Sequence, residues 1–452
     1  MTDRPHVVVV GGGLAGLSAA LECADGGARV TLLERRQRLG GLTWSFTHHG
    51  LNVDNGQHVF LRCCHAYLSF LERIGARDDV TVQERLDIPV VAPAAGQAPP
   101  TVGRLRRSAL PAPLQLAGSL LRYPHLPIVQ RLRLGRALRA LRQLRLDDPA
   151  LDDINFGDWL RAHGQSEAAV ATVWDLITVP TLNLPAAQAS LAPAAMVFKT
   201  GLLEDATAAD IGWSRIPLGV LHGERSSAAL ARAGVAVRLG TRIQTVRPDS
   251  LGGFLVDGMH ADAVVVAVPH EEAAQVLPAG AVAHQARLAE LGASPIVDVH
   301  LVYDRAVTTW PLMAAVHSPV QWVFDRTASA GLDAGQYLAV SISASDDLLT
   351  ERPEALARRV GTEVTRLLPA ADGARIVDSL VTKERRATFR AVPGTAVLRP
   401  VPRTALPGLT VAGAWTNTGW PATMEGAVQS GRAAARDALG ALRRIPEKKE
   451  VA

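Results

Sequence analysis

Two short stretches of the sequence bring chemically useful residues close together. The first, VDNGQHVF at residues 53–60, combines an acid, two amides and an imidazole, contributed by Asp54, Asn55, Gln57 and His58. An acid and an imidazole this close could supply or relay a proton. The alternative is a plain hairpin turn, because Asn-Gly between apolar runs is a strong turn signal. In either case Gly56 would let the backbone approach a neighbouring group closely.

The second stretch, HVVVVGGGLAGLSAALECADGGARVTLLE at residues 6–34, is typical of a nucleotide-binding unit. Its valine run predicts a buried parallel strand. The G-x-G-x-x-G glycines that follow allow a tight turn, the approach of a pyrophosphate and close packing of a helix, whose N-terminus attracts phosphate. A second strand at residues 29–33 ends in an acid that can accept hydrogen bonds from ribose hydroxyls. The residues expected to line this site are Gly11, Gly13, Leu14, Ala15, Gly16 and Glu34.

The elements that must position these stretches come from separated parts of the chain. A chain of 452 residues exceeds what one hydrophobic core usually spans. We therefore predict an α/β fold, with a Rossmann-type domain assembled from discontinuous segments and an inserted α+β substrate domain. The first domain comprises residues 1–85, 206–280 and 401–440, the second comprises residues 86–205 and 281–400, and residues 441–452 form a tail. Apolar patterns predict strands at residues 264–268, 300–305, 336–343 and 409–412, and helices at residues 128–146, 156–162, 168–177 and 422–438.

Charge is distributed unevenly, although the formal net charge is only +4. No acid occurs from residue 88 to residue 146. Leu132, Leu138 and Leu141 recur near one helix face there, which predicts a basic helix that lies against an anionic membrane surface. The alternative is a solvated helix, or one whose arginines pair within the fold. The arginines of this segment are Arg104, Arg106, Arg107, Arg122, Arg131, Arg133, Arg136, Arg139, Arg142 and Arg145.

Several other classes of protein are disfavoured. The three cysteines, Cys23, Cys63 and Cys64, give neither a disulfide framework nor metal-ligand spacing, which favours a reducing cytosol. No uninterrupted apolar run reaches the roughly 18 to 20 residues of a membrane span, and no signal peptide is visible. We expect no metal and no nucleic-acid partner. The expected location is cytoplasmic, peripherally associated with the inner face of the membrane.

Three further segments carry a resemblance to a known superfamily. They are RRQRLGGLTWSF directly after Glu34, GVAVRLGTRIQTVRP at residues 234–248 and GLTVAGAWTNTGWPATMEGAVQSGRAAARDAL at residues 408–439. Together they resemble the amine oxidase and phytoene desaturase superfamily, with Arg38 inside its R-x-x-x-G-G signature. The superfamily often has an acid where Ala414 stands, so one FAD contact lacks its usual residue. The resemblance implies FAD, held non-covalently because no cysteine follows Cys64. The further FAD-binding residues that it implies are Arg35, Gly40, Gly41, Leu42, Gly56, Gln57, Ile243, Gly413, Trp415, Pro421, Ala422 and Thr423.

A closer resemblance spans nearly the whole chain. NVDNGQHVFLRCCHAYLSFLERIG, TVPTLNLPAAQASLAPAAMVF and AGAWTNTGWPATMEGAVQSGRAAA resemble the squalene-associated FAD-dependent enzymes, the hydroxysqualene dehydroxylase family. The resemblance implies a lipophilic isoprenoid substrate whose allylic hydroxyl is replaced by hydrogen, and upstream squalene-pathway enzymes as possible partners. On this interpretation Asp54 or His58 supplies the proton. Glu425 is a second acid candidate, or else an acid that stabilises a helix start.

Three alternatives share the fold and stay open at this point. A carotenoid or phytoene-type desaturase would run the flavin chemistry oxidatively. A flavin amine oxidase would need an aromatic cage, for which Trp415 and Trp420 are candidates. A non-enzymatic isoprenoid carrier would need no flavin, which the intact glycine motif argues against.

Overall fold

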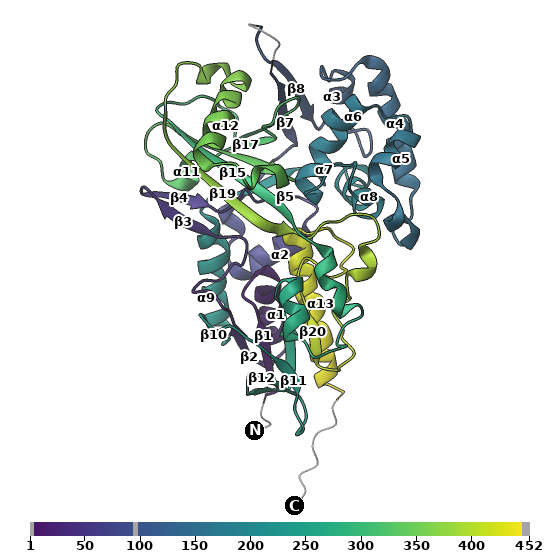
Figure 1. Cartoon of the computed structure of the whole chain (residues 1–452), viewed down its shortest axis with the longest axis vertical. Coiled ribbons are helices and arrows are strands. Elements are labelled where there is room, and N and C mark those ends of the chain that lie inside the picture. Colours follow the sequence, from purple (N-terminus) through teal and green to yellow (C-terminus); the bar gives the residue numbers. More distant parts are fainter. Residues whose placement is uncertain (1–3, 94–97, 445–452) are drawn as a thin grey trace, which may run out of the picture.

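A five-stranded parallel sheet forms the lower part of the molecule in Figure 1, and the computed structural model describes residues 4–93 and 98–444. β1 lies at the centre, and its four valines are buried because helices or strands cover both faces of the sheet. The strands run toward the upper part of the molecule, so the nucleotide site is expected at their upper, carboxyl ends. The sheet order is β10 (Ala236–Arg238), β2 (Arg29–Leu33), β1 (His6–Val10), β14 (Ala263–Val266) and β20 (Leu409–Val411).

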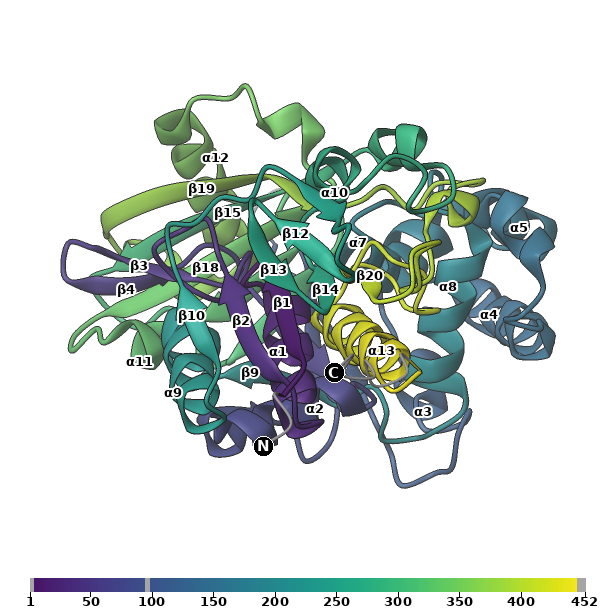
Figure 2. The same cartoon turned by 90° about the horizontal axis from the view of Figure 1, so that it is seen from below.

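Two helices from opposite ends of the chain pack along one face of this sheet. α1 (Leu14–Asp25) and α13 (Met424–Leu442) lie side by side in Figure 2. They approach closely because a Cβ at Gly431 of α13 would overlap the carbonyl oxygen of Ala15 in α1. The assembly of the Rossmann-type fold from discontinuous segments is therefore confirmed.

A seven-stranded sheet forms the upper part and covers the carboxyl ends of the lower strands (Figure 1). Its two long central strands are almost fully buried, and α12 (Pro353–Leu367) packs against one face. The strands predicted at residues 300–305 and 336–343 are confirmed as parts of it. The sheet order is β19 (Ile376–Thr388), β15 (Ser294–Tyr303), β18 (Gln336–Ser343), β17 (Trp322–Asp325), β16 (Leu312–Ala315), β7 (Asp87–Ala92) and β8 (Thr101–Arg106).

Residues 53–60 join two smaller sheets, so the hairpin-turn interpretation of Asn55-Gly56 is wrong. β4 (Leu51–Asp54) pairs with β3 (Ser45–His48), which precedes it, and the chain reverses at His49 and Gly50 with φ of 46° and 86°. The strand after Gly56, β5 (Val59–Leu61), pairs instead with β9 (Ile211–Ser214), as does β6 (Val80–Val82). The last small sheet is β11 (Val246–Pro248), β12 (Phe254–Val256) and β13 (Met259–Ala261).

A cluster of helices lies beside the upper sheet, and it includes the basic helix α4 (Ile128–Gln143) (Figure 1). The prediction that three of its leucines share a face is wrong. Leu141 is fully buried, while Leu132 is 67% exposed, because nine residues of α-helix place two side chains on opposite sides. Within residues 4–93 and 98–444, no helix combines the length and the apolar character needed to cross a bilayer.

The remaining helices complete the described structure, and the predicted helix at residues 156–162 coincides with α5. The predicted helix at residues 168–177 spans α6, a π-helical turn at Val170–Trp174 and α7. Their bounds are α2 (His65–Ile74), α3 (Ala117–Leu121), α5 (Phe156–Ala162), α6 (Glu167–Ala169), α7 (Asp175–Leu182), α8 (Leu191–Phe198), α9 (Arg225–Arg232), α10 (His270–Val276) and α11 (Thr327–Ala330).

Candidate active site

The glycine motif forms the turn between β1 and α1. Gly11 has φ 109°, which favours glycine, and a Cβ there would overlap the carbonyl of Ala267 in the neighbouring chain segment. A Cβ at Gly16 would overlap the Gly11 carbonyl. At Gly13, in contrast, a Cβ would make only an ordinary van der Waals contact, 3.8 Å from the Gly41 Cα, so this side of the turn is the less crowded one. The turn therefore leaves room for a ligand where a pyrophosphate is expected, next to the α1 N-terminus.

Glu34 is buried directly after β2, where its carboxylate is fixed by backbone amides. Its Oε2 accepts a hydrogen bond from the Gly12 N–H at 2.6 Å, and its Oε1 accepts one from the Arg36 N–H at 2.8 Å. Each carboxylate oxygen has a further lone pair. The group is therefore oriented and can still accept hydrogen bonds from ribose hydroxyls.

The arginines after Glu34 have different partners. The Arg35 guanidinium pairs with Glu272 of α10, so the predicted FAD contact of Arg35 stays a prediction. Arg36 and Arg38 instead both donate to the Gly41 carbonyl, at 3.2 and 3.0 Å. Burial lowers the pKa of Arg38 to about 10, and its guanidinium lies 4.2 Å from the centroid of the Trp44 ring. Leu42, the predicted FAD-binding residue directly after Gly41, is 40% exposed.

The C-terminal loop is held in place on both sides before α13 begins. The Gly413 N–H donates to Ser430 Oγ at 2.8 Å, and the Trp415 ring nitrogen donates to the Val268 carbonyl at 3.0 Å. Thr423 caps α13 by accepting a hydrogen bond from the Gly426 N–H at 3.1 Å. The positive end of α13 therefore lies just after Pro421 and Ala422, and the helix begins at Met424, two residues later than predicted. Ile243 lies apart from this loop, buried between β10 and β11.

Glu425 joins two helices. Its carboxylate accepts hydrogen bonds from the Ala66 N–H at 3.0 Å and the Tyr67 N–H at 2.6 Å, which are the first amides of α2, and from the Gln429 side chain at 2.8 Å. An acid at a helix N-terminus is stabilising. These contacts favour the structural alternative for Glu425, with the difference that the helix it caps is α2.

A cavity of about 630 Å³ opens beside Glu425 and Trp420. Its lining mixes acids with arginines, among them Glu204, Asp205 and Arg432. Such a mixture does not suit an isoprenoid chain, which needs an apolar wall.

Asp54 has three partners, and one of them is a buried arginine. Its Oδ2 forms an ion pair with Arg326 at 2.8 Å, and both side chains are buried, at 6% and 8% exposure. Its Oδ1 accepts hydrogen bonds from Ser45 Oγ at 2.6 Å and from the Leu218 N–H at 2.9 Å. These contacts suit a residue that positions the loop better than one that gives up a proton.

The amides of the loop have different surroundings. Asn55 is fixed by the Trp44 backbone, which donates to its side chain at 3.0 Å and accepts from its N–H at 2.9 Å. The Gln57 side-chain nitrogen is buried and has no hydrogen-bond partner within the described residues. His58 Nδ1 lies 3.1 Å from the Gly56 carbonyl, and burial lowers the pKa of this imidazole. The loop therefore holds one unsatisfied donor and one neutral imidazole.

Asp298, which the sequence analysis did not predict as a site residue, lies beneath this loop. It comes from the middle of β15, and a Cβ at Gly56 would be only 3.3 Å from its Oδ2. Burial raises the pKa of Asp298 to about 7, which the nearby Ser341 hydroxyl and Gln57 N–H offset only in part. In the described part of the chain neither carboxyl oxygen has a partner at hydrogen-bonding geometry. Asp298 thus keeps a transferable proton near neutral pH.

A chain of neutral hydrogen bonds supports the loop from the same sheet. Tyr337 OH lies 2.6 Å from His300 Nδ1, His300 Nε2 lies 3.2 Å from Thr382 Oγ1, and Thr382 donates to the Asn55 carbonyl at 3.2 Å. Burial lowers the pKa of His300 to about 3, so its ring is neutral. The pattern assigns the proton to Nε2, because Nδ1 accepts from the tyrosine. The three residues hold Asn55 without placing a charge beside it.

These surroundings fit a flavin dinucleotide. Gly13 offers a less crowded backbone, Glu34 a fixed carboxylate, α13 an N-terminus, and Gln57 a buried donor without a partner. The structure brings Asp54, Gln57 and His58 together with Asp298, whereas Glu425 contacts α2. Sequence reasoning missed Asp298, His300, Arg326 and Arg36. Only Arg36 had a visible signal, since it stands four residues before Gly40 in the R-x-x-x-G-G spacing.

Comparisons with known proteins agree with this geometry. The family model described as "Flavin containing amine oxidoreductase" matches residues 14–439. A hydroxysqualene dehydroxylase of Rhodopseudomonas palustris is 30% identical over 96% of this chain and 98% of its own length. A zeta-carotene desaturase of Zea mays is 25% identical over 94% of this chain and 82% of its own length.

Solved structures share the fold. Cyclohexylamine oxidase from Brevibacterium oxydans matches with a TM-score of 0.73 and 20% identity, over 98% of this chain and all of that chain. Putrescine oxidase with bound putrescine matches with a TM-score of 0.71 and 19% identity, over 97% of this chain and 99% of that chain. The predicted fold class and the resemblance to the hydroxysqualene dehydroxylase family are confirmed.

Proposed function

The chain belongs to the flavin containing amine oxidoreductase family and is an FAD-dependent oxidoreductase, and from this premise we propose that it converts hydroxysqualene to squalene. The proposal is supported by 30% identity to a hydroxysqualene dehydroxylase across nearly both whole chains. We further expect FAD to be bound non-covalently.

The reaction needs one hydride and one proton. The C–O bond of the allylic alcohol breaks, the hydroxyl leaves as water, and a C–H bond forms at the same carbon. FAD in its reduced form would supply the hydride when bound. The protein must therefore protonate the leaving hydroxyl, exclude water from the allylic cation and orient the substrate.

The single structural observation behind the proposed proton transfer is the buried carboxyl of Asp298 beneath the loop, which has no hydrogen-bond partner within the described residues. Asp298 is buried, unpaired and has a pKa of about 7, so it can deliver a proton at neutral pH. Asp54 is held by Arg326 and would position the loop. His58, whose pKa is lowered, would relay or accept a proton as a neutral imidazole rather than store one. We propose Asp298 as the proton source and keep His58 as the relay candidate.

The test compares the two directions of flavin chemistry. FAD-loaded protein is incubated anaerobically with hydroxysqualene and excess reduced FAD, and in parallel with phytoene and oxidised FAD, and the products are identified by mass spectrometry. Squalene in the first reaction alone supports the proposal. The desaturase alternative is tested because of the similarity to zeta-carotene desaturase. It would be supported by a desaturated carotenoid in the second reaction without squalene in the first.

We also propose that the protein takes this substrate from an anionic membrane surface. Large apolar side chains are exposed near the start of α4 and in α3: Leu121 at 50%, Ile128 at 60%, Val129 at 55% and Leu132 at 67%. Four exposed arginines continue along α4, and in the described structure none of them has a carboxylate within 4 Å; they are Arg133, Arg136, Arg139 and Arg142. Apolar side chains beside unpaired cations are the composition of a peripheral membrane contact. The proposed location is therefore the inner face of the membrane.

A further inference from the structure

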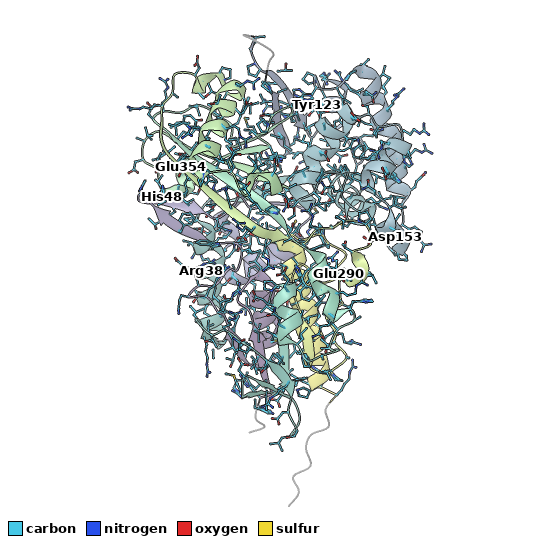
Figure 3. All side chains as sticks on the ribbon, in the orientation of Figure 1. Arg38, His48, Tyr123, Asp153, Glu290 and Glu354 are labelled. Carbon is cyan, nitrogen blue, oxygen red and sulfur yellow. The ribbon has the colours of Figure 1, made fainter. Side chains whose placement is uncertain are left out.

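We propose that the tip of the β3–β4 hairpin and strand β19 form a Zn²⁺ site made by His48, His49 and Asp378. The three residues offer one ligand atom each, and these atoms all lie within 4.8 Å of one another. Figure 3 labels His48 on the hairpin, at the outer edge of the molecule. The site does not take part in the reaction proposed above, and the inference does not depend on that reaction.

The distances between the ligand atoms suit tetrahedral zinc. His48 Nε2 lies 3.3 Å and His49 Nδ1 lies 2.9 Å from the same Asp378 oxygen, Oδ2. Ligands bound to zinc at about 2.0–2.1 Å in a tetrahedron lie about 3.3 Å apart. Small side-chain movements would place all three around one ion. Two imidazoles and a carboxylate prefer zinc to magnesium or calcium, which take mainly oxygen ligands.

Burial and access also fit a bound ion. His48 Nε2 is buried, and within the described residues it makes no hydrogen bond, which is costly for a polar nitrogen. Zinc would satisfy it. His49 is 73% exposed, so the ion can enter from solvent and keep a water as fourth ligand. The two rings lie against each other, with centroids 4.0 Å apart.

The hairpin turn is shaped to present both histidines. His49 adopts φ 46°, which is uncommon for a residue other than glycine, and Gly50 follows with φ 86°. The turn sends His48 and His49, neighbours in sequence, toward the same carboxylate. Strain at a non-glycine residue is a reason to look for a function there.

The position gives zinc a mechanical consequence. β4, the second strand of the hairpin, ends at Asp54, and Thr382 of β19 holds the Asn55 carbonyl. A metal that joins the hairpin tip to β19 would therefore brace the two elements that carry the residue 54–58 loop. A small cavity of about 10 Å³ is lined by His48 and Asp378 of the site and also by His300 and Tyr337, so an ion held there would lie close to that hydrogen-bonded chain.

The test uses FAD-loaded protein without a histidine tag, stripped of metal and dialysed against Zn²⁺, with bound zinc measured by mass spectrometry. We expect one Zn²⁺ per chain and an increase in Tm on zinc addition. His49→Ala and Asp378→Asn should each weaken binding by about tenfold or more, because removing even a supporting residue of a metal site typically costs that much.

The matched control is His260→Ala. His260 is also an exposed histidine beside an acid, 3.7 Å from Asp249, but among the described residues it belongs to no group of three that could hold a metal ion. Its replacement should leave zinc binding unchanged. Substitution of Co²⁺ should give the spectrum of a nitrogen and oxygen tetrahedral site without a thiolate band, which separates this site from the three buried cysteines. Zinc content below stoichiometric in the wild type, or equal in wild type and His49→Ala, would overturn the proposal and leave a simple ion pair between the imidazoles and Asp378.

Discussion

Beside the loop at residues 54–58 a carboxylate and a guanidinium form a buried ion pair, whereas four arginines along helix α4 are exposed and have no carboxylate partner within the described chain. Beside the loop Asp54 is paired with Arg326, while burial raises the pKa of Asp298 to about 7 and lowers that of His300 to about 3. Along α4, Arg133, Arg136, Arg139 and Arg142 are exposed, and no carboxylate of the described chain lies within 4 Å of them. A buried charge is expensive unless paired, whereas a solvated one costs little. The proposed proton transfer would use the first region, and the proposed membrane contact would use the second.

The largest expected effect concerns the buried ion pair. Arg326→Met should destabilise the protein by about 3–5 kcal/mol, because it leaves the Asp54 carboxylate buried without a counter-charge. The measurement is urea unfolding of the FAD-loaded protein. Adding Asp54→Asn to this variant should recover part of the loss.

The control for this prediction is an exposed pair. Arg287 and Glu290 lie 2.8 Å apart at about half exposure each. Arg287→Ala should cost little stability, because both side chains of this pair are solvated. Equal losses for Arg326→Met and Arg287→Ala would remove the distinction between a buried and a solvated charge.

The second prediction concerns the proton of Asp298. Its pKa is raised from 3.8 to about 7 by folding, so the native chain holds this proton longer than the unfolded chain. The stability that this group contributes is present at low pH and is lost as the pH rises toward 7. Between pH 5 and pH 8 the wild type should therefore lose about 3 kcal/mol relative to Asp298→Asn, at about 1.4 kcal/mol per pKa unit.

The Asp298→Asn variant also distinguishes the loss of this proton from damage to the fold. Asp298→Asn should bind FAD with an unchanged visible spectrum and lose squalene formation by about a hundredfold or more. The pH dependence is measured by thermal unfolding in a series of buffers. Parallel stability curves for wild type and variant would show that Asp298 is ionised throughout this range.

A smaller effect is expected at Glu425. Glu425→Gln keeps an acceptor for one of the α2 amides but removes the charge, which should cost about 1 kcal/mol. Squalene formation should stay within a few-fold of the wild type. A large loss of turnover at unchanged stability would instead identify Glu425 as an acid of the reaction.

The smallest expected effect concerns the basic helix. Arg136→Gln should weaken binding to vesicles that contain anionic lipid by about fivefold, since one basic residue near such a surface is worth about 1 kcal/mol. Co-sedimentation at low and high salt measures this. Arg287→Ala, which removes an arginine outside α4, is the matched control, and equal weakening by both would contradict a docking role for α4.

How far the sequence could predict these regions follows from the range of the interactions. The β1–α1 turn, Glu34 and the start of α13 were predictable because each rests on local spacing. Arg326 and Asp298 were not, since they lie 272 and 244 residues from Asp54 and only the long-range pairing of the sheets brings them to it. The shared face of Leu132 and Leu141 was predicted wrongly, although the helical period alone would have separated them.

The hairpin at residues 49–50 illustrates the same limit. Asn55-Gly56 carried the stronger local turn signal, yet the chain reverses at His49-Gly50, because β4 pairs with the strand before it. Strand pairing therefore outweighed the local turn preference of Asn55-Gly56.

The most direct test of the account is a single anaerobic turnover. FAD-loaded protein is reduced with dithionite, freed of excess reductant and mixed with hydroxysqualene in lipid vesicles. The account predicts that the visible flavin absorbance returns in step with the formation of one squalene per flavin. The account would be contradicted if the flavin stayed reduced with hydroxysqualene while phytoene bleached the oxidised flavin of the same protein.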